Sequence, residues 1–465
     1  MEHLSSFAAA FLEAEDSDRH VSLAVGGLAI IEGPMPDFDT MVAAIGERIL
    51  AVPRLRQVLH THLLDLGPPV WAEDPNLDPS HHIHRAALPN GGDDEALFRF
   101  VADAMEKRLD RDRPLWECWI VEGLADDRWA MLMKLHHCIA DGIATVQILS
   151  GLSDEGTGDT FASAIRAATD PPRREFDWTK IGLNPLGWAD GVWHLAERTA
   201  RTVSGAMGGA VELAAGLLSP AAQSSLTGPV TTMRRFSAAR VNLSDVRKVC
   251  REFDVTLNDV ALAAITHSYR AALVRRGEKP RRTTLRTLVP VSVRGNDALG
   301  VTDNRVSAML PFLPVDKDDP LEQLRSVHER LMRSKVTGQR QAGTWFVDLV
   351  NVTPFPLTAW TVRTLLRLPQ RGVVTVATNV PGPRKHLRVM GRDVIQLVPI
   401  PPIALQLRTG IAILSYADDL IFGITADYDT CGDVDEIARG IEEGVARLVG
   451  CGVGPRGLGP QRAEG

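Results

Sequence analysis

The stretch HHCIADG, residues 136–142, is the most informative part of the sequence; it follows the apolar run WAMLMKL, and its last residue, Gly142, begins GIATVQIL. The apolar run is typical of a buried strand and GIATVQIL of a helix, so the stretch between them forms a turn. Along a strand over 130–137, side chains alternate between faces, so His136 and His137 cannot share one role. His137 falls on the more apolar face and on the last residue before the turn, from which a side chain can reach a cleft.

The chemistry of this stretch favours proton transfer. An imidazole with an ordinary pKa of about 6.5 is largely neutral at pH 7 and can accept a proton from a hydroxyl. We therefore interpret His137 as a general base, with His136, Asp141 and Gly142 completing the catalytic group. Asp141 would tie down the loop through an arginine or backbone amides, and Gly142 would allow close backbone approach. The alternative is a pair of core histidines with Asp141 capping the helix.

The composition bounds the class of protein. The chain has 465 residues, which predicts more than one domain, and 45% hydrophobic and 23% charged residues, which is typical of a folded globular protein. The net charge of -7 argues against a nucleic-acid-binding protein. The five cysteines are widely spaced and form no Cys-x-x-Cys pair, so we expect reduced thiols and no zinc site.

The chain shows no export signal and no spanning segment. Glu2, Glu13 and Glu15 lie where a signal peptide would carry a basic start and an apolar run. The least polar stretch, residues 203–218, is Gly-rich, interrupted by Glu212 and too short to cross a bilayer. We therefore expect a cytoplasmic protein.

The pattern of helices and strands predicts a mixed α/β (α+β) fold. In the first half we expect a strand, two helices and a hairpin, over 20–32, 37–52, 93–110 and 114–137. Apolar residues at steps of three and four over 186–218 predict a long linker helix. The second half mixes helices with strands, and in both halves many neighbouring strands look antiparallel. The predicted division is an N-terminal domain, a linker with the long helix and a C-terminal domain, over 1–160, 161–232 and 233–465.

HHxxxDG at the end of a strand resembles the signature of acyltransferases with the chloramphenicol acetyltransferase fold, which include the condensation domains of peptide synthetases. The rest of the chain resembles the bacterial wax ester synthase/diacylglycerol acyltransferase family more narrowly. The matching motifs occur in the family's order and cover essentially the whole chain: LSSFAAAFLEAE at 4–15, RPLW at 113–116, LNDV at 257–260, PVSVR at 290–294, DNRVSAMLPFLPV at 303–315, NVPGP at 379–383 and GIAILSYADDLIFGITAD at 410–427. One departure is Ala8, where the family's LSxxDxxFL pattern usually carries an Asp.

The resemblance implies two chloramphenicol acetyltransferase-like domains with a central channel, joined by a helical linker. It implies an O-acyltransferase that moves a long-chain acyl group from acyl-CoA to diacylglycerol, to a fatty alcohol, or to both. Acyl-CoA is then a substrate, and we expect no cofactor and no metal. We also expect peripheral association with the inner membrane or with lipid droplets. The acceptor, the acyl chain length, the CoA phosphate-binding residues and the choice between monomer and homodimer stay open.

The resemblance also implies roles for two further motifs. Pro114, Leu115 and Trp116 would line or shape the acyl channel, whereas taken alone they predict a proline at a strand edge with a core tryptophan. Asn258 and Asp259 precede an apolar helix, so alone they predict helix capping. The family's Asn-Asp pair implies instead that they face the histidine across the cleft. The two roles are compatible.

Other residues complete the candidate site. Arg294 could hold Asp141 in bidentate geometry, and a solvent-exposed strand end is the rival interpretation. Asn379 of NVPGP is a site-shaping candidate by resemblance. The basic run 275–282 could receive the CoA phosphates or could simply be a solvated loop. No nucleophile motif is evident, and strand alternation turns Cys138 away from His137, so direct transfer is favoured over an acyl-enzyme.

Two other functions stay open. One is a condensation-type acyltransferase that uses a carrier-bound thioester, although the chain carries no recognisable carrier domain. The other is a non-catalytic lipid-binding relative that retains the fold, which the complete HHxxxDG pattern disfavours.

Overall fold

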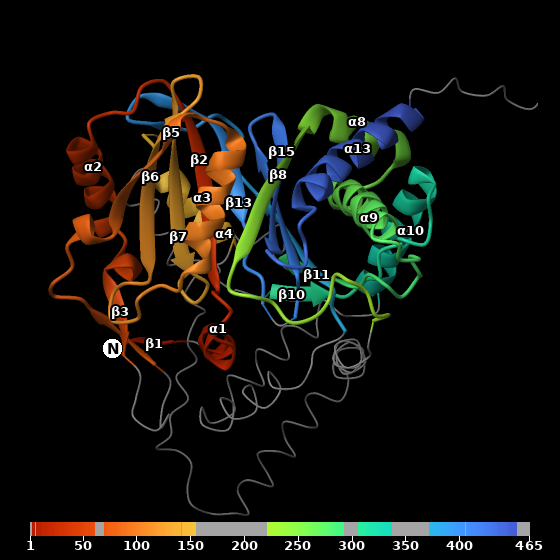
Figure 1. Ribbon diagram of the computed structural model, residues 1–465, viewed down its shortest axis with the longest axis horizontal. Coiled ribbons are helices and arrows are strands. Elements are labelled where there is room, and N and C mark those ends of the chain that lie inside the picture. Colours follow the sequence, from red (N-terminus) through yellow and green to blue (C-terminus); the bar gives the residue numbers. More distant parts are fainter. Residues whose placement is uncertain are drawn as a thin grey trace, which may run out of the picture.

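The computed structural model describes residues 2–4, 6–60, 69–140, 142–154, 221–292, 306–336, 372–404 and 406–452. They form two six-stranded sheets that lie next to each other, with helices packed on their faces (Figure 1). The mixed α/β class is therefore as the sequence predicts. The linker helix expected over 186–218 lies outside the described residues.

The first sheet has the strand order β12-β13-β2-β7-β6-β5. Its strands are β2 (Ala24–Glu32), β5 (Ile83–Gly92), β6 (Trp116–Leu124), β7 (Arg128–His136), β12 (Arg388–Val389) and β13 (Arg392–Ile400). Neighbours run antiparallel except for the parallel pair β5 and β6. The central strands β2 and β7 are buried along almost their whole length, which explains their nearly unbroken apolar sequence.

The predicted hairpin is present as β6 and β7. Its turn places Asp126 and Asp127 in the left-handed region, with φ of 60° and 52°, which aspartate tolerates better than most residues. The expected helices of this half are α2 (Phe38–Leu50), α3 (Asp94–Glu106) and α4 (Gly142–Gly151). Asp37 and Asp93 cap the first two by accepting backbone N–H groups at 3.0 and 2.9 Å.

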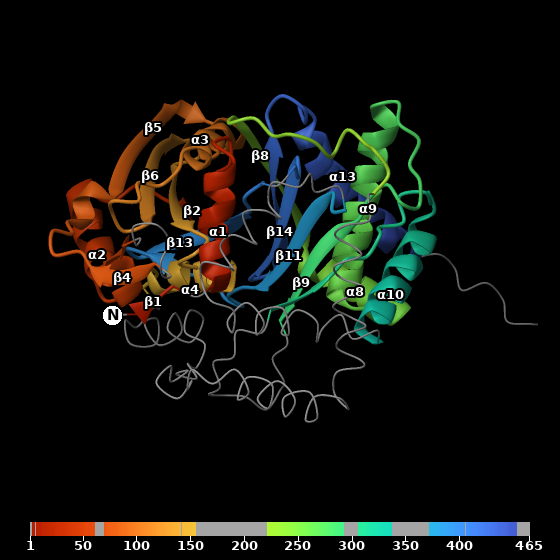
Figure 2. The same cartoon turned by 90° about the horizontal axis from the view of Figure 1, so that it is seen from below.

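Helix α1 (Ser6–Ser17) lies at the junction of the two halves (Figure 2). Ala14 of this helix and Leu23 beyond it pack in one cluster with Val230 and Ile403, which come much later in the chain. Near its start lies a small sheet of order β1-β4-β3. The remaining elements of this half are β1 (Glu2–His3), β3 (Gln57–His60), β4 (Val70–Glu73) and the short 3-10 helices Pro53–Arg56 and Pro79–His81.

The second sheet has the order β10-β9-β11-β14-β15-β8. Its strands are β8 (Arg234–Asn242), β9 (Thr287–Ser292), β10 (Val306–Met309), β11 (Thr375–Pro381), β14 (Thr409–Tyr416) and β15 (Asp419–Asp427). β11 runs parallel to both of its neighbours, β9 and β14, while the other pairs are antiparallel. Many neighbouring strands are thus antiparallel, as the sequence predicts, and the parallel pairs are those of β11 here and of β5 with β6 in the first sheet.

Helices cover the outer face of the second sheet (Figure 1). They are α8 (Leu243–Phe253), α9 (Leu257–Arg275), α10 (Pro320–Val336) and α13 (Val434–Gly452). α13 approaches the backbone of α9 closely because it carries glycine at the contact: a Cβ at Gly440 or Gly444 would lie 2.9 Å from atoms of Ser268 and Ala264. None of the helices in the described ranges is both long enough and apolar enough to span a membrane.

The two halves share a strand. β13 comes from the C-terminal part of the chain, yet it pairs with β2 and so belongs to the first sheet. The Tyr416 hydroxyl, from the second sheet, donates to the carbonyl of Val394 in β13 at 2.7 Å. The division by sequence into 1–160 and 233–465 therefore does not follow the sheets at β12 and β13.

Candidate active site

The two adjacent histidines lie where β7 ends and the turn to α4 begins. β7 ends at His136, one residue earlier than expected. The His136 N–H donates to the carbonyl of Leu115 at 3.0 Å, and the His137 N–H donates to that of Leu23, also at 3.0 Å. Strand alternation therefore does not itself orient His137; the turn and its neighbours do.

The imidazole of His137 packs against helix α1. It stacks on the ring of Phe11, with centroids 4.1 Å apart and an angle of 9° between the planes. The side chain is half-buried, whereas that of His136 is almost completely buried. The stack fixes the plane of the His137 ring, which is the geometry needed by a base that must meet a hydroxyl in one orientation.

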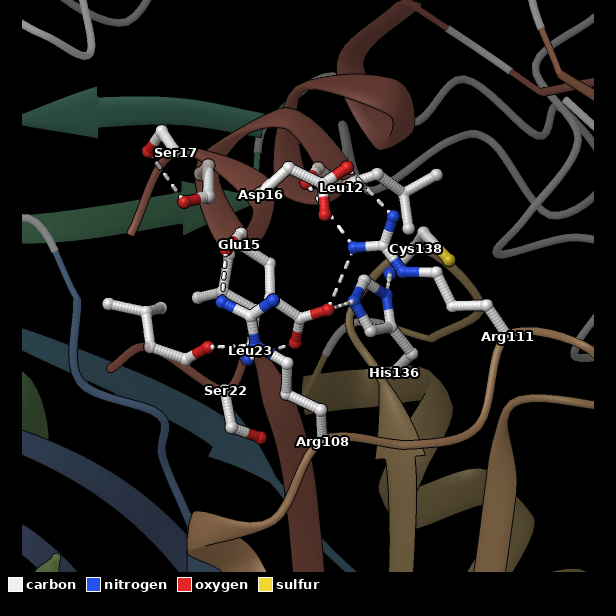
Figure 3. A network of polar contacts seen from close by, with 12 residues as sticks. Leu12, Glu15, Asp16, Ser17, Ser22, Leu23, Arg108, Arg111, His136 and Cys138 are labelled. Carbon is white, nitrogen blue, oxygen red and sulfur yellow. Dashed lines mark hydrogen bonds and ion pairs between the residues drawn. The ribbon is translucent and has the colours of Figure 1, made fainter. Parts of the chain in front are cut away.

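His136 has a different environment. Its Nδ1 accepts the backbone N–H of Cys138 at 3.1 Å, so the ring hydrogen of the neutral form lies on Nε2. Nε2 in turn lies 3.5 Å from the carboxylate of Glu15, and both side chains are 1% exposed (Figure 3). With one nitrogen accepting and the other facing a carboxylate, His136 is placed to donate a proton rather than to remove one from a substrate.

Glu15 is the main residue of this site that sequence reasoning missed. Its carboxylate also accepts the Leu23 N–H at 2.9 Å and pairs with Arg111 at 2.9 Å. Burial by itself raises the pKa of the Glu15 carboxyl, but His136, Leu23 and Arg111 together lower it to about 2. Glu15 is therefore an ionised, buried carboxylate at any physiological pH.

Two arginines fix the C-terminal end of α1 (Figure 3). Arg111 pairs with Asp16 at 2.8 Å as well as with Glu15. Arg108 donates to three backbone carbonyls, those of Glu15, Asp18 and Val21, at 2.5, 2.6 and 2.9 Å. A cation is favoured at the carbonyl end of a helix. Both arginines precede the PLW motif in the sequence, and the charges around them did not predict that they bind α1.

The PLW motif supports the histidine end of β7. Leu115 and Trp116 are fully buried, and the Trp116 Nε1 donates to the carbonyl of Leu55 at 2.8 Å. The Trp116 ring stacks on that of His82, with centroids 4.5 Å apart. The core role of this tryptophan is thus confirmed. That Pro114 and its neighbours line an acyl channel stays a prediction.

The structure brings Gly142 to the NVPGP motif. A Cβ at Gly142 would lie 3.0 Å from Cγ2 of Val380, so α4 meets β11 of the second sheet here. Strand alternation puts Asn379 on the opposite face from Val380, together with the buried Ala377. Its site-shaping role stays a prediction.

Asp259 makes the contacts of a helix cap. The N-cap of α9 is Thr256, and the Asp259 carboxylate accepts both its N–H and its hydroxyl at 2.8 Å, which is a capping box. The same carboxylate oxygen lies 2.9 Å from Nδ1 of His328 on α10. The capping role is confirmed for Asp259, whereas the position of Asn258 and Asp259 opposite the catalytic histidine stays a prediction.

The structure says less about the Asp141–Arg294 pair, the basic run and a metal site. Asp141 and Arg294 lie outside the described residues, so their pairing stays a prediction. In the basic run 275–282, Arg276 is paired with Asp433, with Nε 3.1 Å from the carboxylate, and this arginine is not available to a phosphate. Within the described ranges, no three His, Cys, Asp or Glu side chains are grouped so that they could hold a metal ion.

Cys138 is buried next to the histidines. Burial raises the pKa of its thiol far above the ordinary range, so the nucleophilic thiolate is not populated at neutral pH. The thiol therefore lacks the form that an acyl-enzyme mechanism would need.

Solved structures show which fold this chain has. The wax ester synthase/diacylglycerol acyltransferase from Marinobacter aquaeolei VT8 matches 97% of this chain and 99% of its own, with a TM-score of 0.67 and 24% identity. The first condensation domain of the calcium-dependent antibiotic synthetase matches 98% and 97%, with a TM-score of 0.59 and 15% identity. The chain therefore has the fold that these two proteins share, with its histidine pair at the end of a central strand.

Sequence comparison then identifies the family. The model of the wax ester synthase/diacylglycerol acyltransferase catalytic domain matches residues 4–261, and the model of the C-terminal domain of the same family matches residues 302–448. A protein of Mycobacterium tuberculosis H37Rv named probable diacylglycerol O-acyltransferase is 56% identical over 97% of this chain and 96% of its own. Another diacylglycerol O-acyltransferase by name, from the same strain, is 44% identical over 97% and 91%. The chain belongs to this family and is an acyltransferase enzyme.

Proposed function

We propose that this enzyme transfers a long-chain acyl group from acyl-CoA to the hydroxyl of diacylglycerol, with a fatty alcohol as a further acceptor, and that His137 is the general base. The relatives named as diacylglycerol O-acyltransferases support the choice of substrate. One observation carries the choice of base: the two ring nitrogens of His136 face Cys138 and Glu15, whereas His137 is half-buried at the turn and its ring stacks on Phe11.

In the proposed reaction, an imidazole nitrogen of His137 accepts the hydroxyl proton of the acceptor. The hydroxyl oxygen attacks the thioester carbonyl carbon and forms the new ester bond. The carbon–sulfur bond then breaks, and the imidazolium returns its proton to the departing CoA thiolate. General base catalysis of this kind typically contributes about 10²- to 10⁴-fold.

The transfer is direct, without an acyl-enzyme. Acyl-CoA is a substrate rather than a cofactor, and the reaction needs no other cofactor. The raised thiol pKa of Cys138 supports a ternary complex over an acyl-enzyme. Because both substrates carry long alkyl chains, we further propose that the enzyme works while peripherally bound to the inner membrane or to lipid droplets.

The test compares the wild-type enzyme with His137→Ala. Labelled palmitoyl-CoA is offered with dioleoylglycerol, with hexadecanol or with neither acceptor, and the labelled lipid products are separated and counted. We expect labelled triacylglycerol or wax ester only when an acceptor is present, and a fall in kcat of about 10²-fold or more in the variant. Full activity of a folded His137→Ala enzyme would refute the mechanism.

The same assay tests the other functions. Activity with a carrier-bound thioester, but none with palmitoyl-CoA, would indicate a condensation-type enzyme, whose fold this chain shares. Bound lipid without turnover that depends on His137 would indicate a non-catalytic lipid-binding protein.

A further inference from the structure

One face of helix α1 contacts both histidines. Phe11 and Glu15 are four residues apart on the helix, so they lie one turn apart on the same face. Phe11 stacks on the His137 ring, and the Glu15 carboxylate lies 3.5 Å from Nε2 of His136. The two imidazoles follow each other in the chain but differ in burial, and this single helix fixes both of them.

Glu15 reaches the histidine pair by two routes. The first is its contact with the His136 ring. The second is an indirect connection through the backbone of Leu23. The Leu23 N–H donates to the Glu15 carboxylate at 2.9 Å, and the Leu23 carbonyl accepts the His137 N–H at 3.0 Å. Both routes end at the turn that carries His137.

The carboxylate itself is held rigidly. Arg111 pairs with it at 2.9 Å, and Arg108 binds the backbone carbonyl of the same residue (Figure 3). An ionised carboxylate offers about four acceptor sites, enough for His136, Leu23 and Arg111 together. An amide in its place offers one oxygen, and its NH₂ group would face one of these donors.

We propose that Glu15 is a positioning residue for acyl transfer: its carboxylate, anchored by Arg111, fixes His136 as an N–H donor and so holds the turn that aims His137 at the acceptor hydroxyl. This proposal rests on the proposed role of His137 as the base. Because its side chain is only 1% exposed, Glu15 acts on the rate through the geometry of the histidines rather than by binding substrate. Displacement of a catalytic base by about 1 Å can lower a rate by about 10²-fold.

The first test compares Glu15→Gln with Asp16→Asn. The control removes the other carboxylate of Arg111 from an exposed position that does not contact His136. In folded Glu15→Gln, we expect kcat to fall at least about tenfold while KM for palmitoyl-CoA stays within about twofold, because only the placement of the base changes. Asp16→Asn should keep both constants. Wild-type kcat in a folded Glu15→Gln enzyme would overturn the proposal.

A double-mutant comparison separates positioning from general stabilisation. If Glu15 acts through His136, then Glu15→Gln in a His136→Ala background should cost little beyond the single His136→Ala change. Independent, multiplying losses in the two variants would overturn the proposal. His137→Ala is measured alongside. Full activity of this variant would refute His137 as the base, whereas the role of Glu15 is tested by the kinetics of Glu15→Gln and by the double mutant.

A spectroscopic readout needs no turnover. With ¹⁵N-labelled histidine, the wild-type protein at pH 7 should show one buried imidazole with hydrogen on Nε2 and none on Nδ1. Its Nε2 proton should exchange slowly with solvent, and the resonance is assigned by its loss in His136→Gln. The opposite tautomer at His136, or rapid exchange of the Nε2 proton, would contradict the proposed pairing with Glu15.

Discussion

The carboxylate of Glu15 lies 3.5 Å from Nε2 of His136, and each side chain is only 1% exposed to solvent. The pair joins α1 to the end of β7, two elements that lie far apart in the sequence. A buried carboxylate is costly unless its partners satisfy it, and here Arg111 and the Leu23 N–H do so as well. These contacts support the proposal that the first histidine of HHxxxDG holds the site together and that the second is its base.

His136→Gln should retain much more activity than His136→Ala. Glutamine can place a neutral N–H near the position of Nε2 and can still donate to Glu15, whereas alanine removes that donor. Glutamine loses only the acceptor for the Cys138 N–H, and one hydrogen bond is worth about 0.5–1.5 kcal/mol, so we expect kcat of His136→Gln within about tenfold of the wild type. The measurement is initial-rate kinetics with labelled palmitoyl-CoA and dioleoylglycerol. Were His136 the base, His136→Gln would lose as much activity as His136→Ala.

The stability of the protein should depend on Glu15 in a pH-dependent way. The folded pKa of Glu15, about 2, lies below its ordinary value of 4.5, so its contribution is fully present above about pH 4.5 and is lost as the pH falls toward 2. The difference between these pKa values corresponds to about 3 kcal/mol. Urea unfolding of wild type and Glu15→Gln between pH 3 and 7 should show a gap that narrows at the acid end. A gap that does not change with pH would mean that the carboxylate is not held in its ionised form.

Local patterns in the sequence were sufficient to predict much of the fold. The hairpin of β6 and β7, the capped helix α2 and the helix after HHxxxDG all follow from periodicity and from residues close to them in the chain. The pairing of β13 with β2 could not be predicted in this way, because it joins residues from opposite ends of the chain and leaves no local pattern. The parallel neighbours of β11 were missed for the same reason.

Prediction of the site from the sequence was limited in the same way. HHxxxDG correctly located the histidine pair at the end of a strand, but strand alternation could not orient His137, since β7 ends one residue before it. Glu15 looked no different from Glu13 or Asp16 in the sequence. Only the packing of α1 against the turn distinguishes it, because that contact depends on where Arg111 and Leu23 lie in three dimensions.

Cys138 should be dispensable and unreactive. Its thiol is buried, and burial raises its pKa, so it lacks both access and the reactive thiolate form. Cys138→Ala should therefore keep kcat within about threefold, since a small buried residue is replaced by one slightly smaller. Iodoacetamide should label the exposed Cys451 and leave Cys138 unlabelled, as read by peptide mass spectrometry. Loss of activity in a folded Cys138→Ala enzyme, or a trapped thioester on this residue, would restore the acyl-enzyme mechanism.

The contact between the two sheets should depend on Gly423. This residue lies in β15 of the second sheet, and a Cβ there would come within 1.6 Å of the carbonyl oxygen of Pro399 in β13 of the first sheet. Since the obstacle is backbone, it cannot rotate away, and Gly423→Ala should lower the free energy of unfolding by about 3 kcal/mol or more. Thermal unfolding measures this loss directly. Gly432→Ala is the matched control, because a Cβ at Gly432 meets nothing within 4 Å, and its effect should stay within about 0.5 kcal/mol. Equal melting temperatures for the two variants would show that the sheets do not approach each other at Gly423 and Pro399.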